Sequence, residues 1–319
     1  MAAAAPPPSA APRAPPLLLF AAALVALPLI LPNAYYFDVA IRVAINATLA
    51  IALNLLIGYT GQISLGHAAF FGLGAYGSAI LVSEFGWPPM AALLVSAALV
   101  GALAYAIGRA ILRLEGHYLA MATLGLGVIA SIALANEVAL TGGPDGMPVP
   151  DFSLFGLRVA GERTWYWVFA ALLLAAILLA GNLVDSPAGR ALRALHGSQI
   201  AARAVGVEAS AFKTRVFALS ATAAAIMGSL YGHYEGFVTP GLAAFPKSVQ
   251  LVTMVVVGGM ASIWGSVLGA ALLSLAPEAL ARFEGYETIA FGAILVATMI
   301  FLPRGIAPSL AARFRRKAA

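Results

Sequence analysis

Ten apolar runs, separated by short polar breaks, occupy most of this sequence. Each run is about 16 to 24 residues long, and a helix needs about 20 apolar residues to cross a bilayer. They lie at residues 17–32, 39–57, 62–83, 90–108, 117–139, 165–183, 213–236, 247–262, 264–281 and 286–303. Because lipid offers the backbone no hydrogen bonds, a spanning segment must be a helix or part of a closed barrel, and runs of this length favour helices. The sequence therefore predicts an all-α polytopic membrane protein.

The third, eighth and ninth runs are short or rich in glycine, so each is a candidate for a broken or re-entrant helix. We therefore expect about 8–10 transmembrane or partly re-entrant helices. Residues 1–16 are almost all alanine and proline and are expected to be disordered. The membrane domain is predicted at 17–305, followed by a basic tail at 306–319.

Composition excludes several other classes of protein. Charged residues make up 10% of the chain, whereas soluble domains carry about 25%. The chain has no cysteine, which excludes disulfides and thiol chemistry, and no P-loop motif for nucleotide hydrolysis. None of the four histidines has a second one four residues away, as a helical zinc site would require. We expect neither an enzyme nor a cofactor bound by this chain, and no nucleic-acid partner.

The basic residues predict how the chain is oriented. With ten crossings and a cytoplasmic N-terminus, most of the 18 Lys and Arg residues fall in cytoplasmic positions, as the positive-inside rule requires. The cytoplasmic set is Arg13, Arg109, Arg113, Arg190, Arg193, Arg203, Lys213, Arg215, Arg304, Arg313, Arg315, Arg316 and Lys317; the external set is Arg42, Arg158, Arg163, Lys247 and Arg282. Both termini are thus predicted to be cytoplasmic.

The longest polar, basic interval is the segment at 185–215, which this orientation places in the cytoplasm. Ser186 followed by Pro187 is typical of a helix start. Apolar and basic residues then recur at helical spacing on separate faces, and Gly206 is placed to end a second helix over Gln199–Val205. The segment is predicted to be a pair of short amphipathic helices; the alternative is an ordinary basic loop.

Two glycine patterns inside apolar runs are interpreted as packing sites. Gly72-Leu-Gly74-Ala-Tyr-Gly77 fits G-x-G-x-x-G, but the strand and acidic residue of a dinucleotide site are missing. Gly265-Ser-Val-Leu-Gly269 is a G-x-x-x-G pattern. In membrane helices such glycines allow close helix–helix approach.

Polar residues cluster where the second and third runs meet, among Gly58, Gly61 and Gly66. They are Asn54, Thr60, Gln62, Ser64 and His67. Irregular backbone at membrane depth is tolerated where it is buried in protein or lines a water-filled cavity. We predict that these residues border a translocation path; the alternative is hydrogen bonding between helices in the core.

The residues around this cluster, NLLIGYTGQISLGHAAFFGLGAY at 54–76, closely resemble the LivM-type permease subunit of branched-chain amino acid ABC transporters. Further segments in the same order support the resemblance, which covers about residues 40–308. These are TGGPDG at 141–146, GRALRALHGSQIAARAVGV at 189–207, VVVGGMASIWGSVLGA at 255–270 and PRG at 303–305.

The resemblance implies an ATP-driven importer of a small amino acid, branched-chain by preference, in the bacterial plasma membrane. It also implies separate ATP-binding subunits, a sibling LivH-like permease and an extracytoplasmic solute-binding protein. The 185–215 segment would then couple to the ATPases through Gly189, Arg190, Arg193, Leu195, Ala201, Ala202, Arg203 and Gly206. One departure is His196-Gly-Ser-Gln199, where family members often carry acidic residues.

Three alternatives stay open at this point. A secondary transporter driven by an ion gradient would need no ATPase, although such proteins usually hold ionisable residues within their spans. An assembly protein would have no solute path. An importer of the same class could instead carry urea, amides or aromatic acids.

Overall fold

The computed structural model describes residues 14–154, 157–280, 292–293, 296 and 305–309. Most of the tenth apolar run at 286–303 and most of both terminal segments lie outside the described residues. Among the residues described, five helices are long and apolar enough to cross a membrane: α2 (Ala34–Thr60), α4 (Pro89–Ile111), α5 (His117–Asn136), α7 (Glu162–Asp185) and α10 (Ala209–Glu235). Four shorter apolar helices accompany them: α1 (Ala14–Ile30), α3 (His67–Ser83), α11 (Phe245–Gly258) and α12 (Ile263–Leu280). The predicted all-α polytopic architecture is confirmed.

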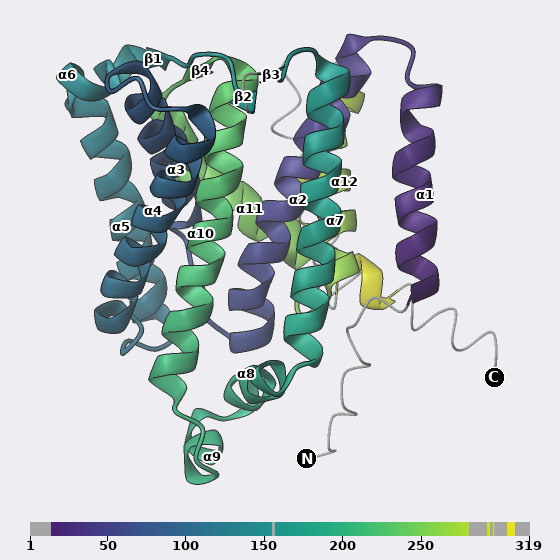
Figure 1. Cartoon of the computed structure of the whole chain (residues 1–319). Helices are drawn as coiled ribbons and strands as arrows, with labels where there is room; N and C mark the ends of the chain where they lie inside the picture. Colours follow the sequence, from purple (N-terminus) through teal and green to yellow (C-terminus); the bar gives the residue numbers. More distant parts are fainter. Residues whose placement is uncertain (1–13, 155–156, 281–291, 294–295, 297–304, 310–319) are drawn as a thin grey trace.

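The bundle has two distinct ends (Figure 1). One, here the strand end, carries short elements that connect the helices: α6 (Val138–Thr141), the 3-10 helix η1 (Gly143–Asp145), β1 (Met147–Pro148), β2 (Ser153–Leu154), β3 (Leu157–Arg158) and β4 (Phe237–Val238). There β1 pairs antiparallel with β4, Met147 opposite Val238. The other, the α8 end, carries α8 (Pro187–Gly197) and α9 (Gln199–Ala204), and α9 projects beyond the other helices.

The centre of the bundle is formed by α2, α3 and α10, which glycines bring close together. A Cβ atom on Gly74 of α3 would lie 2.2 Å from the carbonyl oxygen of Ala225 in α10. On α10, Gly228 approaches the carbonyl oxygen of Phe71 in the same way, at 1.9 Å from a built Cβ. Larger residues would force these helices apart, so the packing interpretation of the G-x-G-x-x-G pattern is confirmed.

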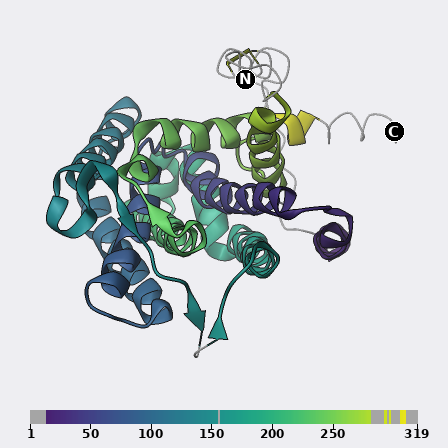
Figure 2. The ribbon, with the colours of Figure 1, turned by 90° about the horizontal axis from the view of Figure 1, so that it is seen from above.

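Helices α11 and α12 form a hairpin whose turn lies beside Asn54 and Gly58, toward the α8 end of α2. After β4 the chain passes through the 3-10 helix η2 (Pro240–Ala243), and α11 then crosses the bundle at a steep inclination (Figure 2). The two helices meet at Gly258 and Gly265, since a Cβ on Gly258 would lie 1.9 Å from the Gly265 carbonyl oxygen. The same view shows α1 at the periphery of the bundle.

Three details of the prediction need correction. The third apolar run becomes helical only at His67, and residues 61–66 are irregular. Residues 14–16, expected in the disordered N-terminus, are the first residues of α1. Lys247, expected in an external loop, lies inside the bundle, where its Nζ donates to Asn46 Oδ1 of α2 at 3.0 Å. Asn46 is about 18 Å along α2 from Ala34, close to the middle of that helix.

Candidate functional site: the coupling segment and the α2–α3 break

The predicted amphipathic pair is present as α8 and α9, and its local chemistry explains where each helix starts. Ser186 caps α8 by accepting from the Gly189 backbone N–H at 3.2 Å, with Pro187 at the first helical position. Ser198 caps α9 through the Ala201 N–H at 3.3 Å. After α9, Gly206 adopts a left-handed φ of 84°. Glycine readily takes this conformation at a helix end, as expected for this position.

Basic side chains of α8 hold the end of α7. Arg193 Nη1 donates to the Val184 carbonyl oxygen at 2.7 Å, and Arg190 Nη1 donates to the Asp185 carbonyl oxygen at 3.3 Å. These carbonyls belong to the last turn of α7, which has no helical N–H to bind them. Both arginines therefore help to fix the angle between α7 and α8.

The apolar side of the segment forms a small core of its own. Leu195, Ala202 and Ala209 are buried together, with Val207 and Phe212 packed against them. This cluster joins α8 and α9 to the start of α10. Gly189 sits at the closest approach to α7, where an added Cβ would lie 2.1 Å from the Val184 carbonyl oxygen. The segment is thus a folded unit docked on the bundle.

The tip of this unit exposes apolar side chains. Ile200 is 84% exposed and Val205 is 78% exposed, both at α9, and the predicted residues Ala201 and Arg203 are exposed beside them. The tip lies beyond the ends of the long helices (Figure 1), in a segment rich in charge. Exposed apolar groups with a polar rim are typical of protein–protein interfaces.

The coupling segment touches the point where α2 ends. Gly61 ends α2 with a left-handed φ of 69°, and a Cβ built there would lie 3.1 Å from Nδ1 of His196 in α8. Gly61 is also the first residue of the irregular stretch 61–66. The coupling segment therefore contacts the chain directly beside the predicted translocation residues.

The irregular stretch 61–66 lies against α5, and the first turn of α3 that follows it lies against α11. The Leu65 N–H donates to Thr123 Oγ1 at 3.0 Å, and the Ala68 N–H donates to Ser248 Oγ at 3.0 Å. Gly66 lies so close to α5 that an added Cβ would be 2.1 Å from the Thr123 carbonyl oxygen. Side chains of two helices, α5 and α11, therefore hold the α2–α3 break and the first turn of α3.

The five predicted path residues fall into two groups. Gln62, Ser64 and His67 are buried, and their side-chain polar atoms have no hydrogen-bond partner among the described residues. Leaving one such group unpaired costs about 1–3 kcal/mol. Unpaired groups at a helix break suit a surface that meets a polar solute or water in another state of the protein.

Asn54 and Thr60 have their hydrogen bonds within the protein. Asn54 Nδ2 donates to Ser262 O at 3.0 Å and to Ser266 Oγ at 2.7 Å, and its Oδ1 accepts from the Ala261 N–H at 3.0 Å. Thr60 Oγ1 donates to the Leu56 carbonyl oxygen at 2.6 Å. Asn54 therefore ties α2 to the α11–α12 turn, and packing alone accounts for both residues.

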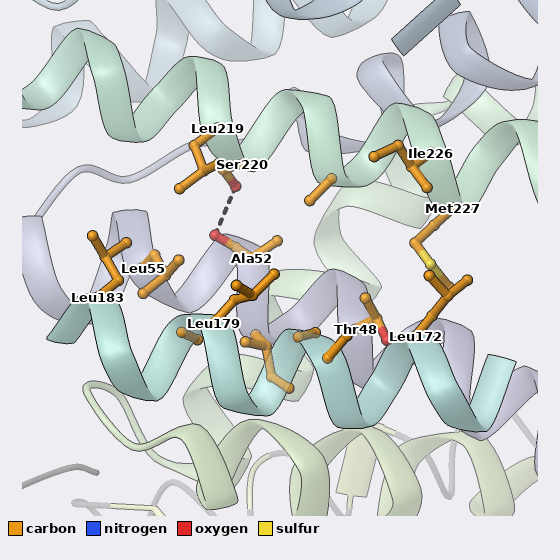
Figure 3. A pocket seen from close by; sticks show the side chains of 15 residues that line it. Thr48, Ala52, Leu55, Leu172, Leu179, Leu183, Leu219, Ser220, Ile226 and Met227 are labelled. Carbon is orange, nitrogen blue, oxygen red and sulfur yellow. Dashed lines mark hydrogen bonds between the residues drawn. The ribbon is translucent and has the colours of Figure 1, made fainter. Parts of the chain in front are cut away.

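An apolar cavity of about 380 Å³ lies elsewhere, between α2, α7 and α10 (Figure 3). Its walls are almost entirely aliphatic. The hydroxyls of Thr48 and Ser220 bind helix carbonyls, Ala44 O at 2.9 Å and Ala52 O at 2.6 Å. A charged or zwitterionic solute would lose its hydration there without replacement, so this cavity does not fit a polar solute.

Comparison with known proteins decides the family. Residues 35–303 match the profile of the branched-chain amino acid transport system / permease component. The chain belongs to this permease family. It is similar to the LivM high-affinity branched-chain amino acid transport system permease protein of Escherichia coli, at 32% identity over 85% of this chain and 69% of the relative. The LivM protein of Salmonella typhimurium has the same identity and coverage.

The LivH permease protein of Escherichia coli is 27% identical over 82% of this chain and 90% of its own length. No solved structure matches. The chain is therefore a LivM-type, multi-pass inner-membrane permease component.

Sequence reasoning about this permease missed three residues. Ile200 and Val205 could have been noticed as large apolar side chains in a charged segment outside the apolar runs. Lys247 follows Pro246 at the edge of an apolar run, and its charge made a loop position the natural choice. Nothing in the local sequence indicates Asn46, some 200 residues earlier, as its partner.

Proposed function

We propose that this permease is the membrane subunit of an ATP-driven importer that carries a branched-chain amino acid into the cell. The observation that supports this best is the coupling segment, a docked unit with an exposed apolar tip. The segment also contacts the α2–α3 break. A surface suited to a partner protein is thereby connected to the unpaired polar groups of the bundle. The substrate class comes from the similar LivM and LivH proteins, which are branched-chain amino acid transport permeases.

The distribution of charge supports a cytoplasmic location for the α8 end. Basic residues gather there, namely Arg109, Arg113, Arg190, Arg193, Arg203, Lys213 and Arg215. The strand end carries fewer basic residues, namely Arg42, Arg158 and Arg163. Helix α1 begins at the α8 end (Figure 1), which supports a cytoplasmic N-terminus. A cytoplasmic C-terminus fits too, because Gly305 approaches Gly259 at the α11–α12 turn.

In this proposal, ATP is bound and hydrolysed by separate subunits that dock on α8 and α9. A shift of the docked unit moves His196 against Gly61, and the α2–α3 break moves with it. A break held by side chains of α5 and α11 can adopt two arrangements if those contacts exchange. A sibling LivH-like permease would complete the pore, and a solute-binding protein would deliver the amino acid at the strand end.

The test is reconstitution of the complete complex in proteoliposomes, with ATPase activity and leucine uptake measured together. We expect the binding protein to stimulate ATPase activity, and uptake to require ATP but to survive collapse of ion gradients. Uptake that continues without ATP and stops when the gradients collapse would instead support a secondary transporter. Absence of both stimulation and uptake would contradict the proposal.

A further inference from the structure

A second cavity, of about 260 Å³, lies between α2, α10, α11 and α12, toward the strand end of the bundle. Unlike the cavity of Figure 3, it is lined by charged and amide side chains as well as apolar ones. Its charged groups come from helices far apart in the sequence. The inference below rests on the proposed import of an amino acid and concerns where that amino acid binds.

Lys247 supplies a positive charge on the α11 wall of this cavity. Its Nζ donates to Asn46 Oδ1 at 3.0 Å and to Gln250 Oε1 at 3.4 Å. Asn46 is held in turn by its own Nδ2, which donates to Ser274 Oγ at 2.9 Å. An ammonium group has three protons, so two oriented contacts leave one for a further acceptor.

No carboxylate of the described residues forms an ion pair with Lys247. The other cation on the wall, Arg42, is already paired, with Asp38 at 2.8 Å and with Glu235 at 3.5 Å. A charge inside a membrane bundle is costly unless it is paired, and such residues commonly mark substrate pathways. Of these two cations, Lys247 is therefore the one that can bind an anion.

A negative group lies on the α12 wall of the same cavity. Glu278 is exposed, and its carboxylate accepts a hydrogen bond from the Tyr35 hydroxyl at the start of α2. Glu278 and Lys247 form no ion pair with each other. The cavity therefore carries a positive and a negative group that are not paired with each other. Each can bind the opposite charge of a small zwitterion.

Apolar side chains complete the wall, among them Ile45, Phe71, Leu242 and Leu273. We propose that this cavity binds the transported amino acid, with its carboxylate on Lys247, its ammonium group toward Glu278 and its aliphatic side chain against this apolar surface. Asn46 and Ser274 act as positioning residues, because they orient the Lys247 ammonium without needing to touch the solute.

The test measures binding of radiolabelled leucine, and of leucinamide, which lacks the carboxylate, to the assembled complex in nanodiscs without ATP or binding protein. We expect Lys247→Met to weaken leucine binding about tenfold or more, because a charge-assisted hydrogen bond is lost. Lys247→Arg should restore most of it. Leucinamide should bind weakly to wild type and to Lys247→Met alike. Thr48→Val, in the cavity of Figure 3, should bind leucine like wild type.

Co-elution of the complex in size-exclusion chromatography checks that each variant assembles. Leucine binding that is unchanged in Lys247→Met, leucinamide binding as tight as leucine, or a transporting wild-type complex that binds no leucine would each overturn the inference. If the wild-type complex shows neither stimulated ATPase activity nor uptake, the proposed function fails instead, so the two failures can be told apart.

Discussion

At the scale of single residues, two glycines of the same helix have opposite surroundings. Gly189 of α8 lies against α7, where an added Cβ would be 2.1 Å from a backbone oxygen, whereas Gly197 at the other end of α8 has no atom within 4 Å of that position. Rigid backbone cannot yield as a flexible side chain can, so the position of a Gly→Ala change should decide its effect.

We expect Gly189→Ala to destabilise the permease by about 1–3 kcal/mol through overpacking, and to lower its apparent thermal midpoint in detergent. Gly197→Ala should change stability by no more than about 0.5 kcal/mol. Equal midpoints for the two variants would show that the α7–α8 contact is looser than described.

At the scale of elements, α9 combines a buried side that anchors it with an exposed side that faces away from the bundle. Ala202 anchors the helix, and Ile200 and Val205 form the exposed side. Arg190 and Arg193 are less suited to testing docking, because their hydrogen bonds to α7 would be lost together with any contact to a partner. The exposed apolar pair separates the two effects.

The double variant Ile200→Ser/Val205→Ser should leave the thermal midpoint of the isolated permease unchanged and reduce binding-protein-stimulated ATPase activity of the complex about tenfold. Removing exposed apolar anchors weakens docking without opening a core cavity. Wild-type ATPase activity in this variant would mean that α9 is not the docking surface. The matched change Leu219→Ser replaces an exposed apolar side chain of the long helix α10, away from α9. It should leave docking intact.

At the scale of the whole molecule, much of the architecture could be predicted from the sequence, because hydropathy and capping are local signals. The apolar runs anticipate α2, α4, α5, α7 and α10 to within a few residues, and Ser186-Pro187 and Gly206 anticipate the limits of α8 and α9. Lys247 contacts Asn46, which in turn donates to Ser274; these partners are distant in sequence, and no local pattern indicates their contacts.

The candidate path shows the same division. Composition indicated all five polar residues near the α2–α3 break equally. Only the tertiary contacts separate Asn54, bound to the α11–α12 turn, from Gln62 and His67, whose polar atoms are unpaired among the described residues.

The orientation of the bundle can be tested with cysteines, since the natural chain has none. Ala160→Cys at the strand end and Ala201→Cys in α9 both replace exposed alanines. In intact cells an impermeant maleimide able to cross only the outer membrane should label Ala160→Cys, and label Ala201→Cys only after the inner membrane is permeabilised. The reverse pattern would invert the proposed topology.

The central claim is that ATP-driven movement of the coupling segment reaches the α2–α3 break. Labelling of Gln62→Cys by a water-soluble maleimide, in the assembled complex with and without ATP, tests this most directly. The account predicts a labelling rate for Gln62→Cys that changes several-fold with nucleotide, while Thr48→Cys, in the cavity of Figure 3, shows no change with nucleotide. A rate at Gln62→Cys that is the same in both nucleotide states would contradict it.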